Sequence, residues 1–226
     1  MSEQRGRAAL PFDGRTALVV TDLQNDFADP AGSLHVAGGE GLVSIVDRLV
    51  GCARDAGALV VYTQDWHPEE TPHFAAFGGA WPPHCVKGTW GAELVAGLDV
   101  AGPVIRKGAN GEDGYSGFTM RDPTSGATVP TGLEALLRGR GVERILVCGL
   151  ATDYCVGATA EDAVALGFRT TLLVDAIRAV DLSPGDGERT IARLEAAGVV
   201  LAEAARLLAA VAGTAPDAAA RAGAVR

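Results

Sequence analysis

The sequence predicts an α/β fold, a three-layer α/β/α arrangement with a mostly parallel central sheet. Short runs of apolar, often β-branched residues recur along the chain, and most are apolar throughout rather than alternating with polar residues. That pattern is typical of strands buried on both faces of a sheet. Between these runs lie segments whose apolar residues recur at helical spacing. Such alternation favours parallel strands with helices on both faces.

The first half of the chain contains three predicted strands and one long helix. A continuous apolar run over residues 16–22 predicts a central strand that ends in an acid. Residues 42–53 have the apolar spacing of an amphipathic helix, which we expect to end at Gly57. Apolar runs at residues 58–63 and 104–107 predict the second and third strands.

The second half continues the alternation after a long irregular segment. Residues 68–101 show no strong periodicity, and such segments in compact domains are usually functional or disordered. Their histidines and aromatic residues favour a function. Beyond them we expect a helix at residues 133–140, a strand at 144–149, a helix from close to Cys155, a strand at 169–174 with Asp175 at its end, a helix at 188–197, a strand at 199–202 and a helix from Glu203 that frays near Arg226.

The composition fits one domain with its own core. The chain of 226 residues has the length of a single domain, with a core over about 16–205 and a tail over 206–226. With 48% hydrophobic residues, it can bury this core without disulfide bonds. Its four cysteines form no CxxC pair, which favours reduced thiols in a cytoplasmic enzyme.

Charge and hydropathy exclude several classes of partner. A net charge of −9 argues against nucleic acid and against an anionic membrane surface. No apolar run has the length of a membrane-spanning helix, and residues 1–11 lack the apolar stretch of a signal peptide. The expected partner is therefore a small soluble molecule.

The turn before the helix that begins near Cys155 contains the first candidate for chemistry. A thiol at a helix N-terminus lies where the helix dipole favours negative charge, so we expect its pKa to fall. Backbone N–H groups at such a turn can also stabilise an oxyanion beside the sulfur. The alternative is that Cys155 is a small buried hydrophobic residue, as most free cysteines are.

Polar residues follow four of the predicted strands at the point where each strand ends. They are Asp22, Asp65, Lys107 and the turn of Cys155. The carboxyl ends of parallel strands meet at one edge of the sheet, where open α/β folds bind their ligands. Taken singly, Asp22 could cap a turn, Asp65 could be a turn residue and Lys107 could extend to solvent. Their convergence favours a catalytic site.

The histidines suggest a metal site in the irregular segment. Asp65, His67, His73 and His84 give one carboxylate and three imidazoles, a set suited to one divalent ion such as Zn, Fe or Mn. The alternative is a loop that merely contains histidines. The fourth histidine, His35, is expected at the surface.

Because those assignments leave no histidine for a Cys–His pair, Asp22 is the best candidate base for Cys155. Lys107 would supply the positive charge that stabilises a thiolate.

These motifs resemble those of the nicotinamidase/pyrazinamidase enzymes within the isochorismatase-like cysteine hydrolases. The resemblance covers about residues 16–202. The matching motifs are Asp22-Leu-Gln-Asn-Asp-Phe27, Asp65-Trp-His67 with His73, Trp81-Pro-Pro-His84-Cys, Lys107-Gly, Tyr115-Ser-Gly-Phe118 and Gly149-Leu-Ala-Thr-Asp-Tyr-Cys155.

The resemblance implies a role for each matching residue. Asp22, Lys107 and Cys155 would form the catalytic triad, and Asp65, His67, His73 and His84 would bind the metal. The peptide bond between Leu150 and Ala151 would be cis, and the N–H groups of Ala151 and Cys155 would form the oxyanion hole. The substrate pocket would be lined by Phe27, Trp81 and Tyr115.

The implied reaction is hydrolysis of nicotinamide, and of pyrazinamide, through a Cys155 thioester during NAD salvage. One alternative is another amidohydrolase of the superfamily that acts on a carbamoyl or ureido compound. A second is an isochorismatase in the strict sense, which would not need Cys155. A non-catalytic protein that binds a metal or metabolite is a third possibility. The sequence leaves open which metal is native and whether the chain forms a homo-oligomer.

Overall fold

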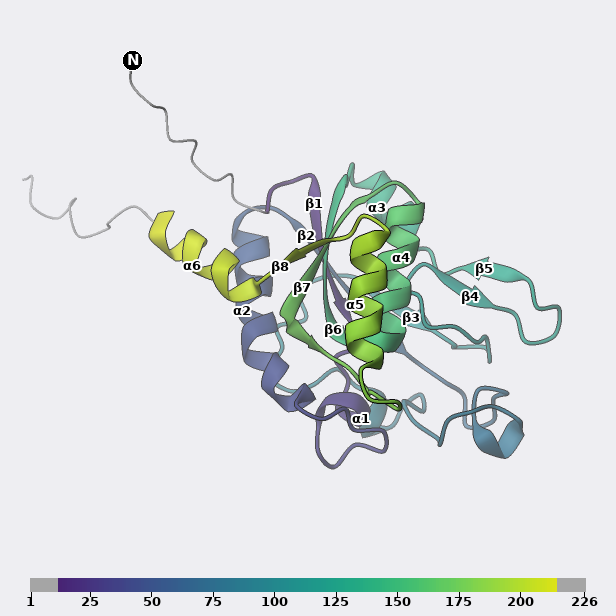
Figure 1. The fold of residues 1–226 in the computed structure, drawn as a ribbon. Coiled ribbons are helices and arrows are strands. Elements are labelled where there is room, and N and C mark those ends of the chain that lie inside the picture. Colours follow the sequence, from purple (N-terminus) through teal and green to yellow (C-terminus); the bar gives the residue numbers. More distant parts are fainter. Residues whose placement is uncertain (1–11, 215–226) are drawn as a thin grey trace, which may run out of the picture.

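A computed structural model of the chain describes residues 12–214, so the predictions for residues 1–11 and for the end of the tail near Arg226 lie outside it. Its centre is a six-stranded sheet of order β3-β2-β1-β6-β7-β8 in which every neighbouring pair is parallel (Figure 1). The strands of this sheet are β1 (Thr16–Thr21), β2 (Leu59–Asp65), β3 (Val104–Lys107), β6 (Arg144–Leu150), β7 (Arg169–Arg178) and β8 (Val200–Ala202).

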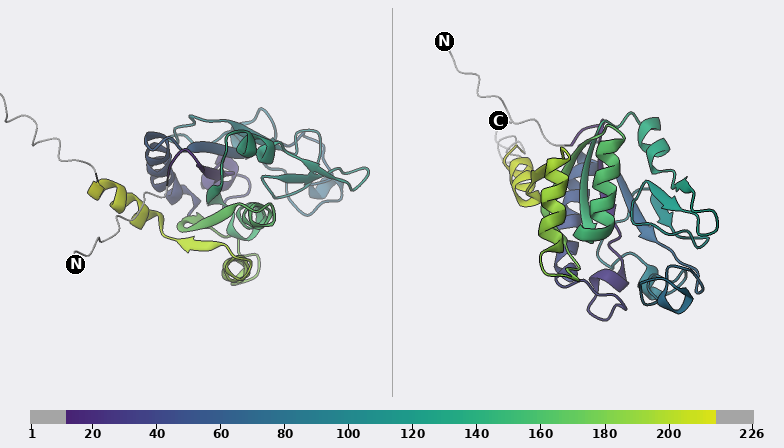
Figure 2. Two further views of the ribbon diagram at one scale, coloured as in Figure 1. Left: turned by 90° about the horizontal axis from the view of Figure 1, so that it is seen from above. Right: turned by 45° about the vertical axis from the view of Figure 1, so that its right-hand side comes forward.

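Helices cover both faces of the sheet, which confirms the predicted three-layer fold. Leu18 and Val20 of β1 pack in one core with helices α2 and α6, whereas Ala17 and Val19 pack in a second core with α3, α4 and α5. The helices α4 and α5 lie side by side against the sheet (Figures 1 and 2). The helices are α1 (Asn25–Ala28), α2 (Leu42–Asp55), α3 (Leu133–Gly139), α4 (Gly157–Ala165), α5 (Asp186–Ala196) and α6 (Ala204–Thr214).

The strand β7 differs from its prediction because it continues to Arg178 instead of ending before Asp175. A register shift between Val147 and Gly149 of β6 allows the two strands to resume pairing further along. The Asp175 carboxylate, placed inside β7, accepts hydrogen bonds from the backbone N–H groups of Ala204 at 2.6 Å and Ala205 at 3.0 Å. It therefore caps the start of α6.

Two elements were not predicted. A separate antiparallel hairpin is formed by β4 (Thr119–Arg121) and β5 (Thr128–Pro130), and α1 is a single short turn. Strands of three residues are too short to show a periodic pattern. Residues 68–101 contain only the short 3-10 turns η2 (Ala75–Phe77) and η3 (Trp90–Ala92), in agreement with their lack of periodicity. None of the helices within residues 12–214 has the length and apolar character needed to cross a membrane.

Candidate active site

The topology brings the predicted strand-end residues to one edge of the sheet. Asp22 follows β1, Asp65 ends β2 and Lys107 ends β3, with Asp65 and Lys107 paired in register. Cys155 lies after β6, which pairs with β1 on the side opposite to β2. Asp22 adopts a left-handed backbone conformation with φ of 44°, which is uncommon outside glycine and is found at functional sites.

Three of these side chains form a buried cluster, which we call the Asp–Lys–Cys cluster (Asp22, Lys107 and Cys155). The ammonium Nζ of Lys107 lies 2.8 Å from Oδ2 of Asp22 and 3.4 Å from Sγ of Cys155. It also donates a hydrogen bond of 3.0 Å to the backbone carbonyl of Tyr115. The other carboxylate oxygen of Asp22 accepts a hydrogen bond of 2.6 Å from the hydroxyl of Thr63. The acid, the amine and the thiol are thus within direct reach of one another.

The surroundings of Cys155 show that the predicted fall of its pKa is wrong. Burial raises the pKa of Cys155 well above its ordinary value; Lys107 opposes this, but the nearby carboxylates of Asp22 and Asp65 raise it further. The residue also lies within a π-helical turn, η4 (Thr152–Val156), rather than in the first turn of an α-helix. At neutral pH the group is a thiol, and it needs a base to become a nucleophile.

The neighbours of that thiol provide such a base. Burial raises the pKa of Asp22, and the nearby charge of Asp65 raises it further. Lys107 lowers it, but the net effect is a raised pKa. A carboxylate with a raised pKa is a stronger proton acceptor. Burial on its own lowers the pKa of Lys107, but Asp22 and Asp65 raise it well above its usual range, so the amine keeps its charge.

The backbone before Cys155 is shaped by one glycine and one unusual peptide bond. Gly149 has φ of 109°, and a Cβ at this position would lie 2.0 Å from the carbonyl oxygen of Thr21, so only glycine fits. The peptide bond between Leu150 and Ala151 is cis, as the resemblance implied. The chain then enters η4, where Sγ of Cys155 lies within 4.8 Å of a carboxylate oxygen of Asp22, the residue that follows β1.

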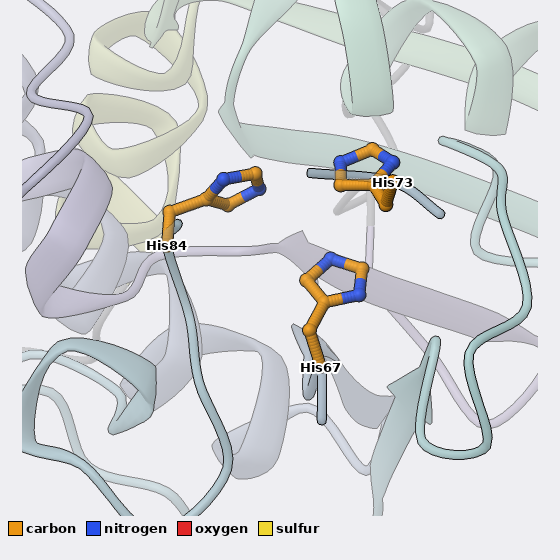
Figure 3. Close-up of side chains that lie close together, drawn as sticks. All are labelled: His67, His73 and His84. Atoms are coloured by element: carbon orange, nitrogen blue, oxygen red, sulfur yellow. The ribbon is translucent and has the colours of Figure 1, made fainter. Parts of the chain in front are cut away.

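A second group of side chains lies beside the first, and we call it the histidine cluster (His67, His73 and His84). All three rings are buried, and one ring nitrogen from each lies within 4.8 Å of the others. Figure 3 shows the three rings pointing toward a shared space from separate stretches of chain. The ring of His67 stacks on that of His73 with centroids 4.6 Å apart, and both rings meet the ring of His84 nearly edge-on.

The hydrogen bonds around these rings fit a divalent ion. Nδ1 of His84 lies 2.8 Å from the carbonyl oxygen of Pro82, and Nδ1 of His73 lies 2.7 Å from Oδ1 of Asp113. Each contact leaves the second ring nitrogen available. Both ring nitrogens of His67 are buried without a hydrogen-bond partner among residues 12–214. Nitrogen atoms left in that state are rare in folded proteins unless an ion or water satisfies them.

The fourth predicted metal-binding residue lies between the two clusters. Oδ1 of Asp65 is 2.9 Å from Nζ of Lys107, and Oδ2 is 3.9 Å from Nε2 of His67. Burial opposes ionisation of this group, but Lys107 and His67 hold the pKa of Asp65 far below its usual value. The carboxylate is therefore ionised, and it faces both the amine of Lys107 and the ring of His67.

A largely apolar pocket opens between the clusters. Its aromatic side is held together by a hydrogen bond of 3.1 Å from Nε1 of Trp81 to the hydroxyl of Tyr115. The ring of Tyr154 packs edge-on against both, with centroids 5.0 and 5.2 Å away. The lining residues are Phe27, Leu34, Val36, Asp65, His73, Trp81, His84, Tyr115, Ala151, Tyr154, Cys155 and Val180.

The structure thus brings the sequence-predicted pocket residues together and adds others. Leu34, Val36, Tyr154 and Val180 were not predicted, because Leu34, Val36 and Val180 are apolar residues in loops distant in sequence. Val180 reaches the pocket because its loop is tied to η4: the carboxylate of Asp153 accepts a hydrogen bond of 2.9 Å from the Val180 N–H. Tyr154 alone had a signal, since it directly precedes Cys155.

The fold and the site define a parallel α/β protein with an acid, an amine and a thiol at the carboxyl ends of its strands. Comparison with known proteins gives the family: the model described as "Isochorismatase domain" matches residues 16–206. The chain therefore belongs to the isochorismatase family.

Several characterised proteins are similar over most of their length. The "Nicotinamidase/pyrazinamidase" of Mycobacterium tuberculosis is 40% identical over 79% of this chain and 92% of its own. The crystal structure of PnC1 from L. infantum in complex with nicotinate is 42% identical, with a TM-score of 0.78 over 86% of this chain and 96% of that one. The structure of the pyrazinamidase of Pyrococcus horikoshii in complex with zinc is 39% identical, with a TM-score of 0.74 over 84% of this chain and 99% of that one.

Proposed function

We propose that the protein is a nicotinamidase, which hydrolyses nicotinamide, and also pyrazinamide, to the ring carboxylate and ammonia. One observation carries the proposal: Cys155 and two members of the histidine cluster, His73 and His84, line the same apolar pocket. A nucleophile and a candidate metal centre therefore face one small cavity. The relative from Mycobacterium tuberculosis and the nicotinate-bound structure support this choice of substrate.

The Asp–Lys–Cys cluster carries out the covalent step. Asp22 accepts the thiol proton as Sγ of Cys155 attacks the amide carbon, and a C–S bond forms while the carbonyl oxygen becomes an oxyanion. The backbone N–H groups of Ala151 and Cys155 stabilise that oxyanion. The ammonium of Lys107, 3.4 Å from Sγ and 2.8 Å from Asp22, stabilises the negative charge as it moves from the carboxylate to the sulfur.

Collapse of the tetrahedral intermediate completes the exchange of bonds. Asp22 returns the proton to the amide nitrogen, the C–N bond breaks and ammonia leaves a thioester on Cys155. A water molecule then gives a proton to Asp22 and attacks the thioester carbon. The C–S bond breaks, the proton on Asp22 returns to the sulfur, and the ring carboxylic acid leaves and loses its remaining proton to solvent, which gives the carboxylate.

Asp65, His67, His73 and His84 would hold one divalent ion, Zn, Fe or Mn. When bound, such an ion supplies a Lewis-acidic position for the ring nitrogen of the substrate. Phe27, Trp81 and Tyr115 pack around the ring and orient the carboxamide over Sγ, which lowers the entropic cost of attack. Two observations support these four residues as the metal site. The ring nitrogens of His67 have no hydrogen-bond partner among residues 12–214, and the structure of the pyrazinamidase of Pyrococcus horikoshii is a complex with zinc.

The alternative substrate is a carbamoyl or ureido compound. Such a compound has no aromatic ring nitrogen to place at the histidine cluster, and the aromatic lining of the pocket suits a flat ring better. A non-catalytic binding protein would not need a thiol held beside both an acid and an amine.

An ammonia-release assay with nicotinamide tests the proposal. We expect turnover by the metal-loaded wild type and none by Cys155→Ala, with an unchanged metal content. Cys52→Ala is the matched control, because that cysteine lies only partly buried in α2, outside the pocket. Deamidation by Cys155→Ala would refute the covalent route, and activity only on ureido compounds would refute the substrate.

The physiological setting is part of the same proposal. The chain is one hydrolase domain with its core at about residues 16–205. It serves NAD salvage in the cytoplasm, where the free thiols of Cys52, Cys85, Cys148 and Cys155 stay reduced.

A further inference from the structure

The three imidazoles of the histidine cluster are held by different partners. His84 contacts the neutral carbonyl of Pro82, whereas His73 contacts the carboxylate of Asp113, 40 residues further along the chain. Nothing so far gives Asp113 a role: it is absent from the pocket lining and from both clusters.

The position of Asp113 is fixed by the hairpin that the sequence did not predict. The backbone N–H of Asp113 donates a hydrogen bond of 2.9 Å to the carbonyl of Arg121. The backbone N–H of Arg121 donates one of 2.5 Å to the carbonyl of Asp113. The guanidinium of Arg121 also lies 3.8 Å from Oδ2, the carboxylate oxygen that does not contact His73. Because Arg121 ends β4, the hairpin of β4 and β5 anchors Asp113.

The exposure of the pair suits an orienting role. The side chain of His73 is 6% exposed, whereas that of Asp113 is 40% exposed. The carboxylate therefore keeps part of its hydration and stays ionised at little cost, while the ring that it contacts is buried. An ionised carboxylate accepts hydrogen bonds only, so Nδ1 of His73 must be the donor. Nε2 is then unprotonated in the neutral ring, with its lone pair free to bind an ion.

We propose that Asp113 is a positioning residue of the metal centre, which fixes the tautomer and the orientation of His73. Its negative charge also makes the imidazole a stronger electron donor to a bound ion. Since the His73 ring stacks on that of His67 with an angle of 15° between their planes, a fixed His73 also restrains the ring of His67, whose nitrogens have no hydrogen-bond partner in the described part of the chain. The inference rests on the proposed metal centre.

Zinc affinity of the purified, metal-free protein tests this role. Competition with a chromophoric chelator should show that Asp113→Asn, which keeps the shape but not the charge, binds Zn²⁺ about 10–100-fold more weakly than wild type. Asp113→Glu should recover part of the loss. The matched control is Glu112→Gln, whose carboxylate is hydrogen-bonded to Asn110 and, among residues 12–214, to no histidine. A zinc affinity of Asp113→Asn within twofold of wild type would overturn the proposal.

A second measurement does not depend on metal or on activity. In the metal-free wild type, long-range ¹H–¹⁵N NMR spectra should show His73 protonated at Nδ1, and Asp113→Asn should show a mixture of tautomers. A wild-type His73 protonated at Nε2 would overturn the inference even if the variant folds poorly.

Failure of the metal centre itself would look different. In that case the wild type would bind no zinc, and the zinc binding of His84→Ala would be the same as that of the wild type. If the wild type binds zinc and His84→Ala does not, the centre stands, and Asp113→Asn alone decides the role of Asp113.

Discussion

The two clusters that face the pocket differ in what completes them. In the Asp–Lys–Cys cluster each reactive group has a partner supplied by the chain, since Lys107 lies 2.8 Å from Asp22 and 3.4 Å from the thiol. In the histidine cluster, both ring nitrogens of His67 are buried without a hydrogen-bond partner among the described residues. The first cluster is therefore complete in the protein alone, whereas the second has nitrogen atoms that a bound ion would satisfy.

The clusters also rest on different scaffolds. Asp22 and Lys107 follow or end strands of the sheet and are almost fully buried, so their positions are set by backbone pairing. His73 and His84 come from the irregular segment and depend on contacts such as that with Asp113. Under the proposed mechanism the difference separates two tasks: the strand ends position the groups that make and break bonds, and the loops hold the groups that orient the substrate.

The largest expected effect tests whether those tasks are separable. Asp22→Asn keeps the size of the side chain but removes the base, so kcat should fall by roughly 10²–10⁴-fold, the range of general acid–base catalysis. The zinc content should not change, because Asp22 belongs to the Asp–Lys–Cys cluster and lies outside the histidine cluster. Steady-state kinetics with metal quantitation would check both.

Loss of zinc from Asp22→Asn would contradict this division, because it would mean that Asp65 and Lys107 transmit the change to the imidazoles. Thr131→Ser is a suitable control, since that hydroxyl bonds the backbone carbonyls of Gly117 and Phe118 and the backbone N–H of Leu133, all outside the pocket.

The same contrast explains what could be predicted from the sequence. Continuous apolar runs revealed the sheet strands, and parallel pairing then required Asp22, Asp65 and Lys107 to lie at one edge. The fold class and the meeting of these residues therefore followed from local pattern and general topology. Family resemblance was needed for the cis peptide bond before Ala151, which no pattern of apolar residues predicts.

Properties that depend on tertiary burial could not be predicted. The pKa of Cys155 was expected to fall, but desolvation and two neighbouring carboxylates raise it, and neither is visible around the residue in sequence. The contact of Asp113 with His73 spans 40 residues and depends on a hairpin with strands of only three residues. Val180 lines the pocket from a loop whose backbone bonds to Asp153, 27 residues earlier in the chain.

An intermediate effect concerns the histidine cluster alone. Burial lowers the pKa of His84 to about 4, although Asp65 and the carbonyl of Pro82 oppose this shift. Histidine in an unfolded chain titrates near about 6.5, so between these values the unfolded state binds more protons than the native state. The free energy of unfolding of the metal-free protein should therefore decrease, by up to about 3 kcal/mol, as the pH falls from about 6.5 to about 4.

Urea unfolding of the metal-free protein at a series of pH values measures this term. His84→Gln lacks the titrating group, and its free energy of unfolding should depend less steeply on pH in the same window. Identical slopes for the two proteins would show that His84 is not the group responsible.

The smallest expected effect lies in the pocket between the clusters, at Tyr115. Its hydroxyl accepts a hydrogen bond from Trp81, whereas its backbone carbonyl accepts one from Lys107. Tyr115→Phe removes only the hydrogen bond from Trp81, so we expect a cost of about 1 kcal/mol in ring binding, or about a fivefold higher KM, with kcat unchanged.

Tyr62→Phe is the matched control, because the Tyr62 hydroxyl bonds the carbonyl of Asp99 away from the pocket. Its loss should lower stability without raising KM. A fall in kcat as large as the rise in KM would mean that Tyr115 affects the covalent step at the Asp–Lys–Cys cluster as well as the orientation of the substrate.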